Sequence, residues 1–146
     1  MPSPPHPELE RLLGACRRRQ DQLLGLLEAL VRQGSYTKDV AGGSVVADLL
    51  GVALEAIDGL EVTRHPSETF APHLTLRSRA AQATAHGCVA LVGHYDTVFP
   101  PGTFEGFVCE DGERGKLARG PGVLDMKGGV AVVVSALRVL AEEGVL

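Results

Sequence analysis

The sequence contains few cysteines, and their spacing excludes the common cysteine-based sites. Cys16, Cys88 and Cys109 are too far apart for a Cys-x-x-Cys motif, which metal binding or redox chemistry would use. Their odd number also argues against a disulfide framework, and Cys88 and Cys109 are expected to be buried as small apolar residues. A reduced, cytoplasmic location is the simpler expectation.

A long apolar run and a positive net charge are also absent. No stretch approaches the roughly 18 apolar residues of a membrane-spanning helix, so a membrane is not expected as a partner. Residues 1–7 have neither the basic start nor the apolar core of a secretory signal, and they are predicted to be a disordered lead-in. The formal net charge of −4 argues against nucleic acid as a partner, because phosphate binding requires a basic surface.

The remaining composition is that of an ordinary globular protein. With 146 residues, 45% of them hydrophobic and 22% charged, the chain is long enough for one domain with a sizeable core but short for two. Residues 8–146 are therefore assigned to a single domain.

Apolar residues at intervals of three and four predict the helices. They indicate a helix or a broken pair over residues 7–32, with a kink near Gly14 or Gly25, a second helix ending near Asp58, and a closing helix over residues 128–143.

Alternating and apolar stretches predict the strands. We expect half-exposed strands at residues 60–64 and 73–77, a small hairpin over 107–118, and a buried strand at 87–92. This order of strands and helices predicts an α/β fold with a mostly parallel central sheet flanked by helices.

The buried strand is followed by Gly93-His94-Tyr95-Asp96, which has the spacing of a metal ligand and its supporter. Strand side chains alternate in direction, so His94 and Asp96 are expected on one side and Tyr95 on the other. A neutral imidazole binds metal, and a nearby carboxylate fixes its tautomer. A lone His-x-Asp is nevertheless more often an ordinary surface histidine.

A second carboxylate, Asp125, follows a short apolar run 29 residues beyond Asp96 (125 − 96) and precedes Lys127. If the two runs are neighbouring strands, Asp125 lies close to His94, and its two oxygens can bridge two divalent ions that activate water. The glycines at 128 and 129 have two readings that stay open: close approach of the helix N-terminus to a ligand, or close packing alone.

Together, GHYDTVFP and ARGPGVLDMKGGVAVVVSAL resemble the N-terminal part of the di-zinc aminoacylase and carboxypeptidase superfamily, which includes acetylornithine deacetylase, succinyl-diaminopimelate desuccinylase and glutamate carboxypeptidase. The resemblance is strong over residues 87–140 and looser over 23–79. It implies that His94 is a zinc ligand, that Asp96 orients it as a candidate catalytic residue, and that Asp125 bridges both zinc ions. It also implies a strained or cis peptide bond after Asp125.

Other parts of the family's site are not matched. The family's general base is one of two adjacent glutamates on a later strand, and its remaining ligands, a carboxylate and a histidine, come later still. Glu142 and Glu143 are adjacent, but they end a predicted helix just before Gly144, where a solvated helix face is the expected role.

The resemblance implies a zinc-dependent hydrolase of amide bonds, an exopeptidase or carboxypeptidase or an N-acyl-amino-acid deacylase, that acts on a small peptide or an N-acyl amino acid. Two Zn²⁺ ions are expected in the complete site, with Co²⁺ or Mn²⁺ as alternatives. With only two ligands in hand, the chain alone is expected to bind zinc weakly and to be nearly inactive. The alternative is an inactive, truncated domain that acts by associating with a partner, such as the missing C-terminal half.

Overall fold

The computed structural model describes residues 6–83, 88–113 and 115–146. Its helices are α1 (Pro7–Arg18), α2 (Gln20–Arg32), α3 (Val40–Glu55), α4 (Arg79–Ala83) and α5 (Gly128–Glu142), and a wide helical turn, η1 (Val123–Lys127), precedes α5. Its strands are β1 (Leu60–His65), β2 (His73–Ser78), β3 (Val108–Gly112) and β4 (Gly115–Arg119). The chain is therefore α/β, as predicted.

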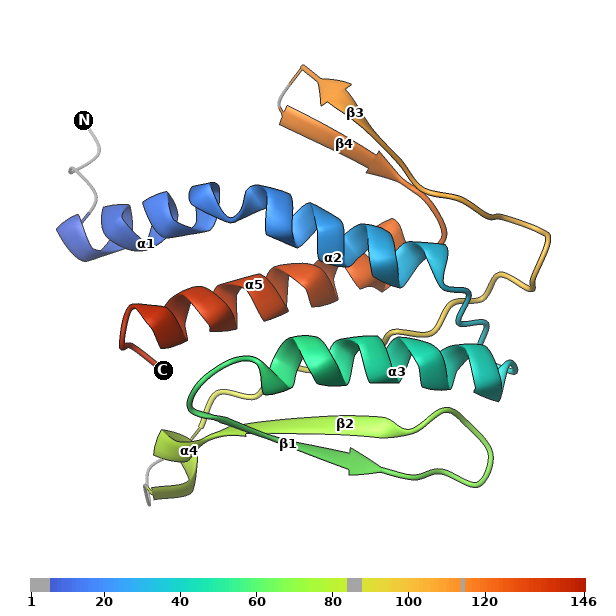
Figure 1. Ribbon diagram of the computed structural model, residues 1–146, viewed down its shortest axis with the longest axis horizontal. Coiled ribbons are helices and arrows are strands. Elements are labelled where there is room, and N and C mark those ends of the chain that lie inside the picture. Colours follow the sequence, from blue (N-terminus) through green and yellow to red (C-terminus); the bar gives the residue numbers. More distant parts are fainter. Residues whose placement is uncertain (1–5, 84–87, 114) are drawn as a thin grey trace.

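The elements form layers (Figure 1). The α1–α2 pair lies along one side of α5, α3 lies on the other side, and the β1–β2 hairpin covers the outer face of α3. The β3–β4 hairpin stands apart beyond α2. Pro7 is the first residue of α1, and residues 1–5 of the predicted lead-in lie outside the described residues.

The core lies where the inner faces of the three long helices meet. The side chains of Leu30 in α2, Val46 and Leu50 in α3, and Val134 in α5 are at most 3% exposed. The hairpin adds the apolar residues of its alternating strands: Leu60, Val62, Leu74 and Leu76. The antiparallel register, from Leu60 opposite Ser78 to His65 opposite His73, places these four residues on the face toward α3. The alternation in the sequence thus predicted this hairpin correctly.

The first two helices are separated at Arg19, not at either glycine. Gly14 and Gly25 lie inside regular helix, so the predicted kink positions are wrong. Arg19 instead pairs with Glu142 at the end of α5 and donates a hydrogen bond to Gln22. A long-range ion pair therefore accompanies the break, and local glycine propensity does not decide it.

The two sheets are both two-stranded and antiparallel, so the described residues do not form a mostly parallel central sheet. Of the buried strand that we predicted over residues 87–92, residues 88–92 belong to no helix or strand, and Gly87 lies outside the described residues. Val89 and Val92 are 90% and 91% exposed, which overturns the predicted burial. A strand needs neighbours to pair its backbone groups, and the parallel bridge that the structure records here, between Tyr36 and Thr97, lies beyond the end of this segment.

Two further observations concern the cysteines and the apolar length of the helices. Cys16, Cys88 and Cys109 are all exposed, so the predicted burial of Cys88 and Cys109 is wrong. Within the described ranges, no helix is both long and apolar enough to cross a membrane.

Candidate functional site

His94 and Asp125, which are 31 residues apart in the chain, lie in direct contact. The Nε2 atom of His94 is 3.0 Å from Oδ1 of Asp125. The side chain of His94 is 46% exposed and that of Asp125 is 85% exposed, so both can be reached from solvent. The structure thus places the two predicted metal ligands on one small surface.

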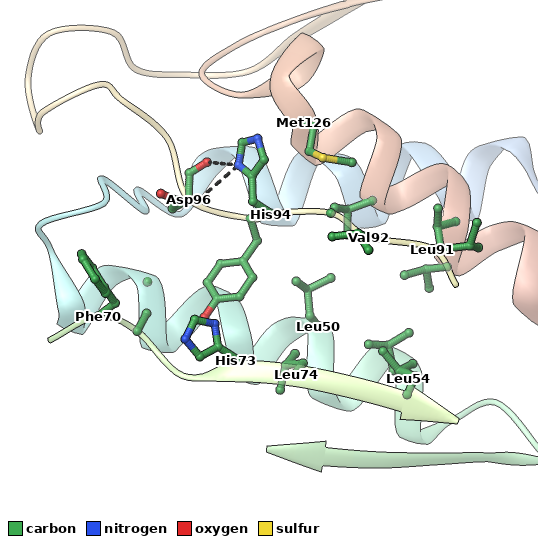
Figure 2. A pocket seen from close by; sticks show the side chains of 18 of the residues that line it. Leu50, Leu54, Phe70, His73, Leu74, Leu91, Val92, His94, Asp96 and Met126 are labelled. Atoms are coloured by element: carbon green, nitrogen blue, oxygen red, sulfur yellow. Dashed lines mark hydrogen bonds and ion pairs between the residues drawn. The ribbon is translucent and has the colours of Figure 1, made fainter. Parts of the chain in front are cut away.

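Asp96 lies behind the imidazole. Nδ1 of His94 is 3.2 Å from Oδ1 of Asp96 and 3.1 Å from its backbone oxygen, and both contacts are drawn in Figure 2. The Tyr95 side chain points to the opposite side, where its hydroxyl donates to the Pro72 carbonyl. The predicted alternation of direction is confirmed, although the segment is not a regular strand.

A close approach at Gly122 brings the Asp125 turn to this segment. Gly122 has a φ of 76°, and a Cβ atom added there would lie 2.8 Å from Cγ2 of Thr97. Only glycine combines that backbone conformation with that contact. The peptide bond between Asp125 and Met126 is cis, as the family resemblance implied.

Lys127 connects the same turn to the end of α2. Its side chain is 1% exposed, and Nζ donates hydrogen bonds of 2.7 and 2.9 Å to the carbonyls of Leu30 and Gln33 at the end of α2. Burial lowers the pKa of Lys127 to about 8. A Cβ atom on Gly128 would lie 2.4 Å from the Val123 carbonyl, which supports the packing role for this glycine.

The surrounding carboxylates favour the charged form of His94. Desolvation by itself lowers the pKa of this imidazole, but the hydrogen bond to Asp125, the backbone oxygen of Asp96 and the charges of both aspartates together raise it above its ordinary value. The contact with the Asp125 carboxylate thus stabilises the protonated imidazole.

The space between Nε2 of His94 and the Asp125 carboxylate also fits a divalent ion. Zinc lies about 2.0–2.2 Å from histidine nitrogen and carboxylate oxygen, so two of its tetrahedral ligands are roughly 3.4 Å apart. The observed separation of 3.0 Å is shorter by a few tenths of an ångström, which a small side-chain rotation supplies. The donor set, one imidazole and one carboxylate, is ordinary for zinc.

The described residues do not complete such a site. Over residues 6–83, 88–113 and 115–146, no group of three or more histidine, cysteine, aspartate or glutamate side chains converges in a way that could hold a metal ion. Glu142 and Glu143 pair with Arg19 and Arg11 of the first helix pair, which agrees with the expected helix-face role.

A cavity of about 460 Å³ opens on the Tyr95 side of the same segment (Figure 2). Leu50 and Leu54 from α3 and Leu74 from β2 line one side of it, and Leu91 and Val92 line the other. Its lining is mainly apolar.

Sequence reasoning missed Ser35 and Thr37, which hold the segment that carries His94. Thr37 Oγ1 donates a 2.6 Å hydrogen bond to Oδ2 of Asp96, and Ser35 Oγ donates a 2.7 Å bond to the Tyr95 carbonyl. The only available signal was the pair of hydroxyl residues in the loop before α3, which is also common in ordinary turns.

The amino-acid sequence is similar to a known protein family and to a curated protein. Residues 90–146 match the family described as Peptidase family M20/M25/M40. Over 131 residues, the chain is 39% identical to a succinyl-diaminopimelate desuccinylase of Methylobacterium nodulans. The match covers 83% of this chain but only 30% of that relative, so the chain spans less than a third of the curated protein's length.

Proposed function

Because residues 90–146 belong to peptidase family M20/M25/M40, we propose that this chain carries the first part of the active site of a metal-dependent hydrolase that cleaves amide bonds. The observation that carries this proposal is the contact of His94 Nε2 with Asp125 Oδ1 at 3.0 Å, backed by Asp96. His94 and Asp125 are 31 positions apart in the sequence, and both side chains are exposed. Their contact is therefore not one that the stability of the fold requires.

In the proposed site, His94 and Asp125 hold a divalent ion, with Zn²⁺ as the first candidate and Co²⁺ or Mn²⁺ as alternatives. When bound, such an ion supplies Lewis-acid activation of the amide carbonyl and of water. Asp96 accepts a hydrogen bond from Nδ1–H of His94 through its backbone oxygen, with its carboxylate 3.2 Å away, and this leaves the Nε2 lone pair for the ion. Asp125, whose side chain is 85% exposed, would be the residue available to a second ion.

The remaining parts of the reaction require further groups. Two ligands are fewer than the three that catalytic zinc sites usually draw from protein, so we propose that further ligands and the general base come from polypeptide beyond the residues described here. The name of the desuccinylase relative favours a deacylase acting on an N-succinyl amino acid, and a small peptide remains the alternative substrate. We also propose a cytoplasmic location, which three exposed, unpaired cysteines support.

Isothermal titration of the chain with Zn²⁺ tests the proposal. We expect weak, saturable binding that is lost in His94→Gln and Asp125→Asn, and that falls by about 10–100-fold in Asp96→Ala, as for other residues that orient a ligand. His65→Gln is the matched control, because His65 is an exposed histidine at the end of β1 and should leave binding unchanged. Equal binding by all variants would refute the metal site, and tight binding with full turnover by this chain alone would refute the division of the site.

The exposed apolar segment supports a second proposal, that the chain associates with further polypeptide. Val89, Leu91 and Val92 are 90%, 65% and 91% exposed, and Leu91 and Val92 line the apolar cavity. Such surface is costly in water and marks an interface. We propose that this segment is a strand of a mostly parallel sheet that further polypeptide completes, and the parallel bridge between Tyr36 and Thr97 supports this proposal.

Binding of an apolar dye tests the association. The chain alone should bind the dye and self-associate in sedimentation, and Val89→Asp with Val92→Asp should reduce both. Val52→Asp is the control, because Val52 is 71% exposed on α3 away from this segment. A double variant that behaves like the unmodified chain would contradict the proposal.

A further inference from the structure

The loop before α3 holds the His94 segment through its backbone. In this loop, which we call the Ser35–Thr37 clamp, the Ser35 carbonyl accepts a 2.8 Å bond from Thr97 N, and Thr37 N donates a 3.0 Å bond to the Thr97 carbonyl. Ser35 is 1% exposed and Thr97 is 5% exposed, so these bonds are shielded from water. These bonds fix the backbone after Asp96, and the bond from the Ser35 hydroxyl to the Tyr95 carbonyl fixes the backbone before it.

One side chain of the clamp reaches beyond the backbone to the Asp96 carboxylate. Thr37 Oγ1 lies 2.6 Å from Oδ2 of Asp96 and 3.2 Å from the Thr97 carbonyl, and its single proton goes to the nearer, charged oxygen. The other carboxylate oxygen, Oδ1, lies 3.2 Å from His94 Nδ1, which also has the Asp96 backbone oxygen at 3.1 Å. The two oxygens therefore have separate partners, which sets the rotation of the carboxylate about its last bond.

The clamp is itself fixed against the start of α3. Oδ1 of Asp39 accepts a 3.0 Å bond from Gly42 N at the first turn of that helix. A Cβ atom on Gly42 would lie 2.6 Å from the Gly34 carbonyl, so the loop and the helix are in close contact there. Thr37 consequently sits on a support that does not depend on the His94 segment.

From this chain of contacts we infer that Thr37 is a positioning residue for the candidate site: it holds the Asp96 carboxylate so that Nδ1 of His94 keeps the ring proton and Nε2 is left for a ligand. Without the Thr37 hydroxyl, the carboxylate can rotate away from Nδ1, which then keeps only the Asp96 backbone oxygen as its acceptor, and a larger share of the proton moves to Nε2. A protonated Nε2 cannot bind a metal ion. The part of this inference that concerns metal rests on the proposed function, and the part that concerns the tautomer does not.

The tautomer is measured without metal from the ¹⁵N chemical shifts of the His94 ring, at a pH where the imidazole is neutral. An Asp125→Ala background removes the carboxylate that competes for the proton at Nε2. In that background we expect Thr37→Val to shift the population away from the Nδ1–H form, and Thr37→Ser, which keeps the hydroxyl, to restore it. Thr75→Val is the control for loss of a threonine hydroxyl, since Thr75 contacts His65 in the β1–β2 hairpin.

Zinc affinity, measured with Asp125 intact, gives the second readout. Thr37→Val should weaken binding by about 3- to 10-fold, less than direct loss of the orienting carboxylate, and Thr37→Ser should bind like the unmodified chain. An unchanged tautomer in Thr37→Val, or a Thr37→Ser variant as impaired as Thr37→Val, would overturn the inference. If the tautomer shifts as expected but no variant, including the unmodified chain, binds zinc, the positioning role stands and the proposed function fails.

Discussion

Replacing Lys127 by methionine removes a buried cation that caps a helix. The last carbonyls of a helix have no partner within it, and Lys127 Nζ supplies one to Leu30 at 2.7 Å and another to Gln33 at 2.9 Å. Methionine nearly preserves the length and apolar stem of the side chain but cannot donate. The substitution therefore leaves polar groups without partners in a place that is shielded from water.

The size of the effect follows from two opposed terms. A hydrogen bond from a charged donor is worth about 1.5–3 kcal/mol, whereas removing the cation also removes the cost of burying it. We expect Lys127→Met to lower the free energy of unfolding by about 2–4 kcal/mol at pH 7. Lys116→Met is the matched control: Lys116 pairs with Asp111 at the surface of the β3–β4 hairpin, so its loss should change stability far less than the loss of Lys127.

The pH dependence has a definite sign. Burial lowers the pKa of folded Lys127 to about 8, below its ordinary value of 10.5, so the unfolded state binds more protons between these values. The free energy of unfolding of the unmodified chain should therefore rise relative to that of Lys127→Met as pH increases from 8 to 10, by up to about 3 kcal/mol.

Urea unfolding followed by circular dichroism at pH 7 and pH 9.5 measures both effects. Far-ultraviolet dichroism is the suitable signal because the sequence contains no tryptophan. A loss at pH 7 no larger than that of Lys116→Met would refute the capping role. A difference between the two chains that shrinks with pH would refute the lowered pKa.

Three further outcomes can be measured on the same chain. Gly122→Ala should cost about 1–3 kcal/mol in urea unfolding, because its φ of 76° and the 2.8 Å approach to Thr97 both oppose a side chain. Leu30→Ala, at a site that is fully buried, should cost about 2–5 kcal/mol in the same assay. Zinc binding should release a proton from His94, whose raised pKa extends competition to higher pH, so the affinity should increase with pH across the neutral range and calorimetry in two buffers should detect the proton. An affinity that does not vary with pH would contradict the third outcome.

Local patterns predicted the elements whose stability depends on near neighbours in the chain. The β1–β2 hairpin follows from alternation in residues 60–64 and 73–77, and α5 from the spacing of its valines and leucines. The segment at 88–92 has an equally apolar pattern, yet it is unpaired and exposed, because a strand is stabilised by ladders that its own residues do not encode. An apolar sequence predicts that a segment is buried, but it does not predict which other segment covers it.

The candidate site was predictable only in part for a similar reason. The His94 and Asp125 motifs suggested a meeting point, and the structure brings the two side chains together, while their role in metal binding stays a prediction. Thr37 and Lys127 were not identified for the contacts they make, 59 and 97 residues away in sequence. Threonine in a loop and lysine before a helix are usually solvent-exposed, so the residue types did not predict these long-range hydrogen bonds.

The candidate site has a consequence for folding, because it is assembled from three stretches distant in sequence: the Ser35–Thr37 clamp, the segment around His94 and the turn at Asp125. Contacts of this range become favourable only after the intervening loops have closed, at the cost of their chain entropy. The site is therefore not a local unit that forms early on a single helix or hairpin. A fluctuation that separates Thr97 from Ser35 also removes the support that holds Asp96 beside His94.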